Sequence, residues 1–291
     1  MASWRAWVLA VRVPTLTAAV APVLVGTAVA ARQGQFRPWG ALGALVVSLC
    51  IQVGTNLHND VLDFLRGADT TSRRGPARAT QSGLLTPKQA AAGAYVWFGV
   101  AGAVGLAFAA RYGWPVVAAG LLAIAAGLGY TGGPWPIGYH GFGELFVFLF
   151  FGLLAVAGTT YVQAGSVSVL AIAAAVPVGL LATAIIVVNN LRDLETDRAA
   201  GKRTLAVRIG ERRTRGLYLG CLVGAGIVPV VMRCVGLVEG WFWLPWLTVP
   251  LGVALIRAVW RVSTAAEYNR SLRRTAALHL LFAMLLAASL V

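Results

Sequence analysis

Charged side chains are scarce in this chain of 291 residues, making up 12% of it, whereas 58% of the residues are hydrophobic. An average soluble domain carries about 25% charged residues. A disordered chain is poor in apolar residues, so this composition excludes disorder. It also supplies more apolar surface than one soluble core can hide. The composition therefore predicts an all-α polytopic membrane protein, with a single membrane domain over 1–291.

Acidic residues are the scarcest charged class. The chain has 10 Asp and Glu against 24 Lys and Arg, which gives a formal net charge of +14. Such a balance can indicate nucleic-acid binding. Here, however, the basic residues fall in short gaps between apolar runs, as membrane topology requires. We therefore expect a lipid bilayer as partner, and no nucleic acid.

Cysteine and histidine are equally rare, with three residues of each type. Cys50, Cys221 and Cys234 lie within or at the end of apolar segments, without CxxC spacing, as buried small residues do. The three histidines do not cluster in the sequence. The chain therefore shows no sign of a zinc or haem site.

Long apolar runs are what the chain has in abundance. A helix needs about 20 mostly apolar residues to cross a bilayer. Nine stretches qualify and are predicted as transmembrane helices: 14–32, 39–58, 88–110, 114–131, 142–163, 167–190, 214–233, 241–259 and 273–290. With the N-terminus in the cytoplasm, 20 Lys and Arg lie on the inner side and four on the outer side. The positive-inside rule therefore predicts a cytoplasmic N-terminus and, after nine crossings, an external C-terminus.

Six of the ten acids are concentrated in two windows, NLHNDVLDFLRGAD at 56–69 and NNLRDLETD at 189–197. Each window lies at the inner end of a predicted helix. Residues four apart share a helix face, so Asn59 pairs with Asp63, and Asn189, Asp193 and Asp197 form one stripe. Amide and carboxylate oxygens are hard ligands that suit Mg²⁺, which proteins commonly hold together with substrate phosphates. Two such faces predict a site for a metal with an anionic substrate.

The two windows also resemble a repeat. Asn56, Leu57, Asp63 and Gly67 recur 134 residues later as Asn190, Leu191, Asp197 and Gly201. A second register, with an offset of 130, pairs Asn59 and Asp63 with Asn189 and Asp193. Either register predicts two related four-helix halves plus a ninth helix, with the site near their interface.

Basic residues follow each acidic window. Arg66, Arg74, Arg78 and Lys202 lie within reach of the acidic helix ends, and the planar fork of Arg suits phosphate oxygens. Acids for a metal and bases for phosphate on one membrane face predict a Mg–diphosphate site. Topology alone is the alternative explanation for these basic residues.

An uncharged inner loop with several aromatic residues, GYTGGPWPIGYHGFGE at 129–144, separates the two halves. Tyr130, Trp135 and Tyr139 are candidates to line a pocket that shields a carbocation, because aromatic faces attract cations. An interfacial aromatic belt accounts equally well for Trp135.

These segments resemble the UbiA superfamily of intramembrane prenyltransferases. NDVLDFLRGAD is similar to the first motif of that superfamily, and DLETD followed by GKRT is similar to the second. The first window departs from the NDxxDxxxD spacing, since position 67 is Gly and the third acid is Asp69. With GPARATQSGLLTP and YTGGPWPIGYHGFGE, this longer spacing resembles the dihydroxynaphthoate branch, which serves menaquinone synthesis.

The resemblance implies a nine-helix bundle with a cytoplasm-facing cavity, Mg²⁺ as cofactor, a polyprenyl diphosphate donor and an aromatic acceptor. By motif position the metal ligands would be Asn59, Asp63, Asp193 and Asp197, supported by Asp60 and Asp69. Tyr130 would face the allylic cation, with Tyr139 beside it. Asn56, Asn189 and Asn190 complete the expected substrate-binding set, together with the four basic residues.

The implied reaction transfers a polyprenyl group to 1,4-dihydroxy-2-naphthoate with loss of carbon dioxide and diphosphate, giving demethylmenaquinone at the cell membrane. Two alternatives stay open at this point. One is prenylation of another ring, such as hydroxybenzoate or homogentisate. The other is a membrane transporter, because intramembrane acids also mark ion pathways. A transporter would place ionisable residues near the middle of the membrane, whereas here they crowd one face.

The topology is directly testable. A cysteine introduced at position 72 of a cysteine-free variant should react with a membrane-impermeant maleimide only after the cells are opened, because both windows should face the cytoplasm. Labelling from outside intact cells would contradict the predicted orientation.

Overall fold

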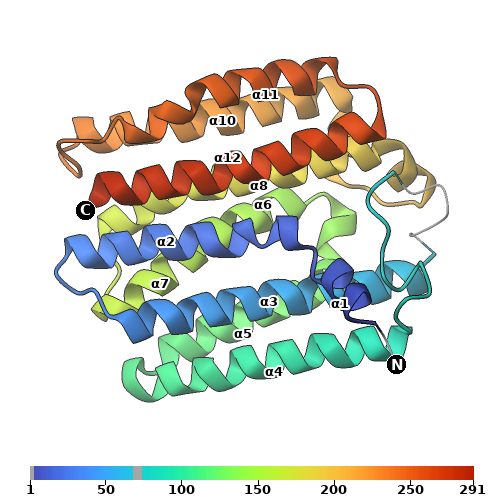
Figure 1. Cartoon of the computed structure of the whole chain (residues 1–291), viewed down its shortest axis with the longest axis horizontal. Helices are drawn as coiled ribbons and strands as arrows, with labels where there is room; N and C mark the ends of the chain where they lie inside the picture. Colours follow the sequence, from blue (N-terminus) through green and yellow to red (C-terminus); the bar gives the residue numbers. More distant parts are fainter. Residues whose placement is uncertain (1–2, 68–73) are drawn as a thin grey trace.

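The computed structural model describes residues 3–67 and 74–291. Asp69 and position 72 lie outside the described residues. The described part is helical and contains no strand, and its long helices run side by side along one axis (Figure 1). They are α1 Trp4–Val11, α2 Thr17–Arg32, α3 Pro38–Leu65, α4 Pro87–Tyr112, α5 Trp114–Thr131, α6 Gly143–Val147, α7 Ala155–Ala164, α8 Val169–Ala199, α9 Leu205–Ile209, α10 Glu211–Cys234, α11 Val249–Arg261 and α12 Ala265–Leu290. The short elements η1 Val13–Thr15, η2 Ile137–His140, η3 Phe148–Leu154 and η4 Leu244–Thr248 connect or extend them.

Within the described residues, seven helical stretches are long and apolar enough to cross a membrane. An eighth arises if Trp4–Thr15 and Thr17–Arg32, which meet at a bend of 51°, count as one span. The eighth predicted span, 241–259, differs from expectation. It forms η4 followed by α11, and α11 alone has 13 residues, about 20 Å at 1.5 Å per residue. The chain is therefore a multi-pass helical membrane protein with seven or eight clear spans.

The second acidic window, and the first window as far as Leu65, lie inside helices rather than in the loops after them. The two helices α3 and α8 end on equivalent residues, Leu65 and Ala199, which are 134 positions apart. Gly67 and Gly201 follow them with φ of 67° and 72°, the left-handed conformation that ends helices. The structure thus supports the 134-residue register for the two helix ends. Both ends lie at the same end of the bundle (Figure 1).

The buried core falls into two clusters, one around each of these helices. The smaller cluster joins α3 to α1, α4 and the segment 79–85, and the larger surrounds α8 with parts of α2, α10 and α12. The helix α2, from the first half of the sequence, packs with α8 from the second half. The two core clusters therefore do not correspond to the two halves of the sequence. The acidic ends of α3 and α8 nevertheless belong to different clusters, so a site between them lies at a seam.

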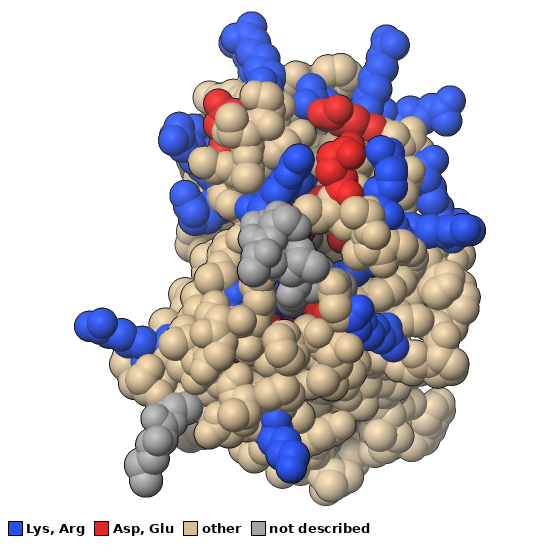
Figure 2. All heavy atoms as spheres, turned by 90° about the vertical axis from the view of Figure 1, so that its right-hand side faces the viewer, with Lys and Arg blue, Asp and Glu red and all other residues tan. Residues whose placement is uncertain are grey.

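Basic residues separate between the two ends of the bundle. The four that the sequence places outside are Arg32, Arg37, Arg111 and Arg233, all at helix termini remote from the acidic windows. The opposite face, seen in Figure 2, gathers many Lys and Arg around a smaller group of acidic side chains. The N-terminus lies at the end that carries both windows and the C-terminus at the other (Figure 1).

The fifth predicted span is not a uniform α-helix. It begins as α6, widens into the π-helical η3, and continues as α7. The widened segment packs closely on α8: a Cβ on Gly152 would come 2.6 Å from the Cα of Gly179. Only glycine permits this close approach, which brings α6 and the preceding loop against the helix that carries the second window.

Gly152→Ala should destabilise the protein by about 1–3 kcal/mol, because the atoms that its Cβ would meet are backbone atoms of α8 and cannot rotate away. Gly158→Ala is the matched control, since a Cβ there meets nothing within 4 Å. Thermal unfolding in detergent measures both effects. Equal unfolding temperatures for the two variants would contradict this account of the packing.

Candidate active site

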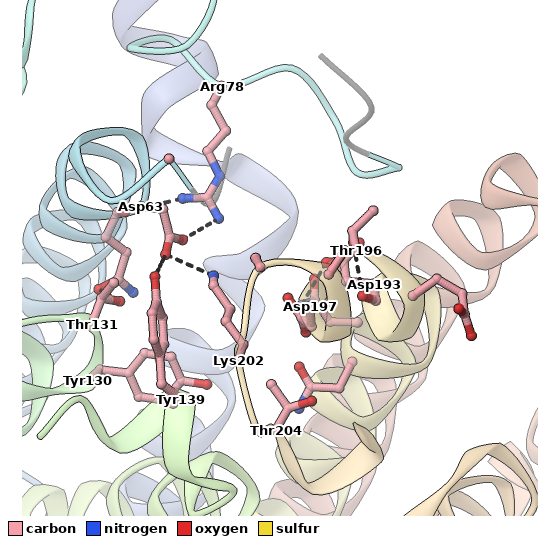
Figure 3. A pocket seen from close by; sticks show the side chains of 18 of the residues that line it. Asp63, Arg78, Tyr130, Thr131, Tyr139, Asp193, Thr196, Asp197, Lys202 and Thr204 are labelled. Atoms are coloured by element: carbon pink, nitrogen blue, oxygen red, sulfur yellow. Dashed lines mark hydrogen bonds and ion pairs between the residues drawn. The ribbon is translucent and has the colours of Figure 1, made fainter. Parts of the chain in front are cut away.

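A cavity of about 420 Å³ opens between the acidic ends of α3 and α8. Residues from both windows and from the central loop line it together (Figure 3). The lining residues are Arg12, Asn59, Asp63, Gly67, Arg78, Tyr130, Thr131, Gly138, Tyr139, Asn189, Asn190, Asp193, Glu195, Thr196, Asp197, Ala199, Ala200, Lys202 and Thr204. Segments more than 100 residues apart in sequence therefore share one site.

Asp63, in the wall of this cavity, is bound by side chains from three other segments. Its Oδ1 accepts hydrogen bonds from the Tyr139 hydroxyl at 2.7 Å and from Lys202 Nζ at 2.9 Å, and its Oδ2 pairs with Arg78 Nη2 at 2.9 Å (Figure 3). Arg78 also donates from Nη1 to the backbone oxygen of Asn59 at 3.3 Å. One carboxylate on α3 thus joins the loop before α4, the central loop and the segment after α8.

Asp193 is held differently, by the residue next to it. Arg192 is 2% exposed and donates from Nε to Asp193 Oδ1 at 2.8 Å and from Nη2 to Oδ2 at 2.6 Å. It also donates to the side-chain oxygens of Asn189 at 2.7 Å and Asn269 at 2.8 Å. Arg192 therefore sets the direction of the Asp193 carboxylate and ties α8 to α12.

The central loop is fastened to the end of α3. Arg66 donates to the backbone oxygens of Thr131 and Gly133 and lies 5.3 Å from the centre of the Tyr139 ring. Lys202 Nζ lies 4.4 Å from the same ring centre. Burial, followed by the negative charge of Asp63, raises the pKa of the Tyr139 phenol above its usual value. At neutral pH the phenol consequently stays protonated and remains a donor to Asp63.

The structure brings together most of the predicted site. Asn59, Asp63, Asn189, Asn190, Asp193, Asp197, Arg78, Lys202, Tyr130 and Tyr139 all line the cavity. Asn59 Oδ1 accepts a hydrogen bond from the Thr131 hydroxyl at 2.7 Å. Tyr130 and Tyr139, the aromatic residues expected to shield a cation, line the same cavity as these polar side chains.

Other predicted residues lie outside the cavity lining, and each has a structural reason. Asn56 donates to the backbone oxygen of Val11 at 2.9 Å and to the Thr15 hydroxyl at 3.0 Å, so it holds the turn between α1 and α2. Arg66 secures the central loop, as described above. Trp135 stacks on His140, with ring centres 4.4 Å apart.

Asp60 and Arg74 likewise face other parts of the fold. Asp60 is 1% exposed and accepts hydrogen bonds from the Thr80 backbone N–H and hydroxyl at 3.2 and 3.1 Å, while Arg78 approaches it at 3.8 Å. Arg74 is exposed, and its backbone oxygen accepts a hydrogen bond from Asn269. Asp69 lies outside the described residues.

Several cavity residues were missed from the sequence. Nothing in the sequence distinguishes Arg12 from the other basic residues of the inner side, yet it reaches the cavity from a left-handed backbone conformation with φ of 56° and lies 3.9 Å from Asp60. Glu195 lines the cavity as well, although it lies outside the stripe formed by Asn189, Asp193 and Asp197. Thr131, Thr196 and Thr204 carry no charge and offered no signal. Arg192 was counted only as a basic residue.

The donor set suits a hard cation only if phosphate oxygens accompany it. Among the described residues, no three His, Cys, Asp or Glu side chains come together as a metal cluster. Instead, α3 and α8 each present a small number of amide and carboxylate oxygens to the same cavity. Mg²⁺ is commonly bound by one or two carboxylates plus substrate phosphates, which is the arrangement available here.

Comparison with known proteins decides the family. The profile of the UbiA prenyltransferase family matches residues 19–288 of the chain. The chain belongs to the UbiA prenyltransferase family. Its relatives include the 1,4-dihydroxy-2-naphthoate octaprenyltransferase of Mycobacterium tuberculosis, 40% identical over 100% of this chain and 98% of the relative. The enzyme of the same name from Escherichia coli is 37% identical over 93% of this chain and 90% of the relative.

Solved structures of UbiA homologues share the fold at low sequence identity. The apo UbiA homologue from Aeropyrum pernix matches with a TM-score of 0.71 at 13% identity, covering 93% of this chain and 96% of the homologue. The homologue from Archaeoglobus fulgidus bound to GPP and Mg²⁺ matches with a TM-score of 0.64 at 14% identity, covering 97% of this chain and 99% of the homologue. The helical bundle described above is thus the UbiA fold.

Proposed function

We propose that this protein transfers a polyprenyl group from polyprenyl diphosphate to 1,4-dihydroxy-2-naphthoate. The observation that carries the proposal is the single cavity lined by two acidic helix ends, with Arg78 and Lys202 beside Asp63. The full-length similarity to enzymes named 1,4-dihydroxy-2-naphthoate octaprenyltransferase supports this choice of acceptor.

Asn59, Asp63, Asp193 and Asp197 would hold Mg²⁺ together with the diphosphate. When bound there, Mg²⁺ would offset the negative charge that grows on the departing diphosphate. Arg78 and Lys202 already lie at the cavity wall with several donors each, so they can transfer from Asp63 to diphosphate oxygens. Charge-assisted hydrogen bonds of this kind strengthen as the allylic C–O bond breaks and its electron pair leaves with the diphosphate.

The aromatic residues of the central loop would shield the resulting allylic cation. Tyr130 and Tyr139 both line the cavity, and aromatic faces stabilise cations. The ring carbon that bears the carboxylate of dihydroxynaphthoate attacks the cation, and carbon dioxide leaves in place of a proton. The product is the reduced form of demethylmenaquinone. The surrounding apolar helices would keep water from the cation and accommodate the polyprenyl chain in the bilayer.

The same proposal includes the topology of nine crossings, with the active site facing the cytoplasm of the cell. Two observations support it: the termini lie at opposite ends of the bundle, which requires an odd number of passes, and basic residues concentrate at the end with the cavity. In this topology η4 and α11 together make the eighth crossing.

Purified protein should convert dihydroxynaphthoate and a polyprenyl diphosphate into a prenylated lipid only when a divalent metal is present. Mass analysis of the lipid and measurement of released carbon dioxide identify the product. Asp63→Asn should lower turnover by orders of magnitude, because the substitution removes the carboxylate that meets Arg78 and Lys202. Full activity in EDTA would contradict the metal site, and products formed only with hydroxybenzoate or homogentisate would contradict the acceptor.

The basic residues should separate by role. Arg78→Ala and Lys202→Ala should raise the donor KM or slow the reaction, and Arg78→Lys should restore activity only in part because Lys lacks the planar fork. Arg257 and Arg270 are exposed and are not among the residues that line the cavity, so alanine there should leave the kinetics within about twofold. Steady-state kinetics with varied donor measure the contrast. If all four alanine variants behave alike, these basic residues serve topology and not diphosphate.

A further inference from the structure

Glu144 is a buried acid that the proposed chemistry does not yet use. It lies at the start of α6 and is 5% exposed. Its Oε1 accepts a hydrogen bond from Asn190 Nδ2 at 2.8 Å, whereas its Oε2 makes no hydrogen bond with any described residue. A buried carboxylate with one hydrogen bond is costly, and an apolar residue of similar volume would generally be no less stable. Fold stability therefore does not account for an acid at this position.

The contact with Glu144 determines how the Asn190 amide is turned. The amide presents Nδ2 to the Glu144 carboxyl group, whose Oε1 accepts the hydrogen bond. The amide oxygen then points away from Glu144. Asn190 lines the cavity, and the contact with Glu144 is the one hydrogen bond of its side chain within the described part of the chain. Asn190 therefore offers the cavity its amide oxygen as an acceptor, while Glu144 engages one of the two N–H groups of Nδ2.

This orientation changes the role expected for Asn190. An amide oxygen cannot donate to the oxygens of a diphosphate, which are acceptors as well. It can accept a hydrogen bond from a hydroxyl group. The neighbouring Asn189 is not equivalent, because Arg192 already donates to its amide oxygen at 2.7 Å.

Asn190 lies farther from the end of α8 than the two proposed metal ligands of that helix. It precedes Asp193 by three residues and Asp197 by seven, about 4.5 and 10 Å along a helix at 1.5 Å per residue, and α8 runs toward the end of the bundle that carries the windows. Asn190 thus lies deeper in the bundle, on the side of Glu144 and the central loop. An aromatic ring that meets the allylic carbon from below a diphosphate at the mouth of the cavity would contact this part of the wall.

We infer that Asn190 accepts a hydrogen bond from a ring hydroxyl of the aromatic acceptor, and that Glu144 is the positioning residue that keeps the Asn190 amide turned for this contact. The inference rests on the proposed function. It makes the Asn190 amide oxygen the group that would favour an acceptor ring with a hydroxyl substituent. No bond is made or broken by either residue.

The experiment compares Glu144→Leu with Asn190→Leu in the purified, membrane-derived protein, with Mg²⁺, polyprenyl diphosphate and dihydroxynaphthoate. Leu has no acceptor for Asn190 Nδ2, so the Asn190 amide is free to turn. We expect each variant to raise the acceptor KM about tenfold, the worth of one hydrogen bond, with the donor KM within about twofold of the unsubstituted protein. Because both act through one contact, the double variant should be no worse than Asn190→Leu alone.

Thr183→Val is the matched control, because it changes the packing near Glu144 without changing the contact between Glu144 and Asn190. The Thr183 hydroxyl donates to the backbone oxygens of Gly179 at 2.8 Å and Glu144 at 3.4 Å, but does not touch the Asn190 amide. Its acceptor KM should stay within about twofold. Thermal unfolding of every variant separates misfolding from altered binding, and Glu144→Asp, which keeps a carboxylate, should recover part of the acceptor affinity.

The outcomes are distinct. An unchanged acceptor KM in both variants, with the unsubstituted protein active on dihydroxynaphthoate, overturns this inference and leaves the proposed function standing. A raised donor KM or a raised metal requirement, with an unchanged acceptor KM, also overturns it, because Asn190 would then serve the diphosphate or the metal. Absence of activity on dihydroxynaphthoate in the unsubstituted protein overturns the proposed function and this inference with it.

Discussion

The buried carboxylate of Asp63 is the interaction on which the rest of the site depends. It lies at the end of α3, yet its partners Tyr139, Arg78 and Lys202 come from three different segments. A charge at that depth is tolerated only when it is paired and hydrogen-bonded. This requirement draws the central loop, the segment before α4 and the segment after α8 to one point, and the cavity is the space they leave around it.

The two acidic helix ends each carry a carboxylate that needs a cationic partner, and the partners come from different places. On α3, Asp63 depends on cations supplied by other segments, which an anionic substrate can draw away. On α8, Asp193 depends on its own neighbour Arg192, which is buried and also holds Asn269 of α12. The first arrangement places exchangeable cations at the cavity wall, whereas the second keeps a carboxylate in one direction. In the proposed function the site accepts and releases diphosphate, and both properties would serve that task.

The two sides and the two ends of the cavity are built from different parts of the fold. The ends of α3 and α8 belong to separate packing clusters, and the central loop and α6 reach the cavity by close packing of η3 on α8 at Gly152 and Gly179. Charged groups gather toward the end of the bundle, while Tyr130, Asn190 and Glu144 lie farther in. The charged end and the deeper wall correspond to the two parts of the substrates in the proposed reaction, the diphosphate and the aromatic ring.

The sequence by itself determined the membrane class, the two acidic helix ends and most of the residues that line the cavity. Hydropathy, charge scarcity and the four-residue spacing of Asn59 with Asp63 depend only on local pattern, and the helix ends at Gly67 and Gly201 follow a local conformational preference. Tertiary structure alone decided which polar groups face the cavity. Asn56 and Asp60 share the window of Asp63, yet they bind the turn at Val11 and the backbone of Thr80. Arg12 and Arg192, which resemble topological charges in the sequence, lie at the site or hold it in place. The physical reason is that a buried polar side chain must find a partner, and the partner's position comes from segments distant in the sequence.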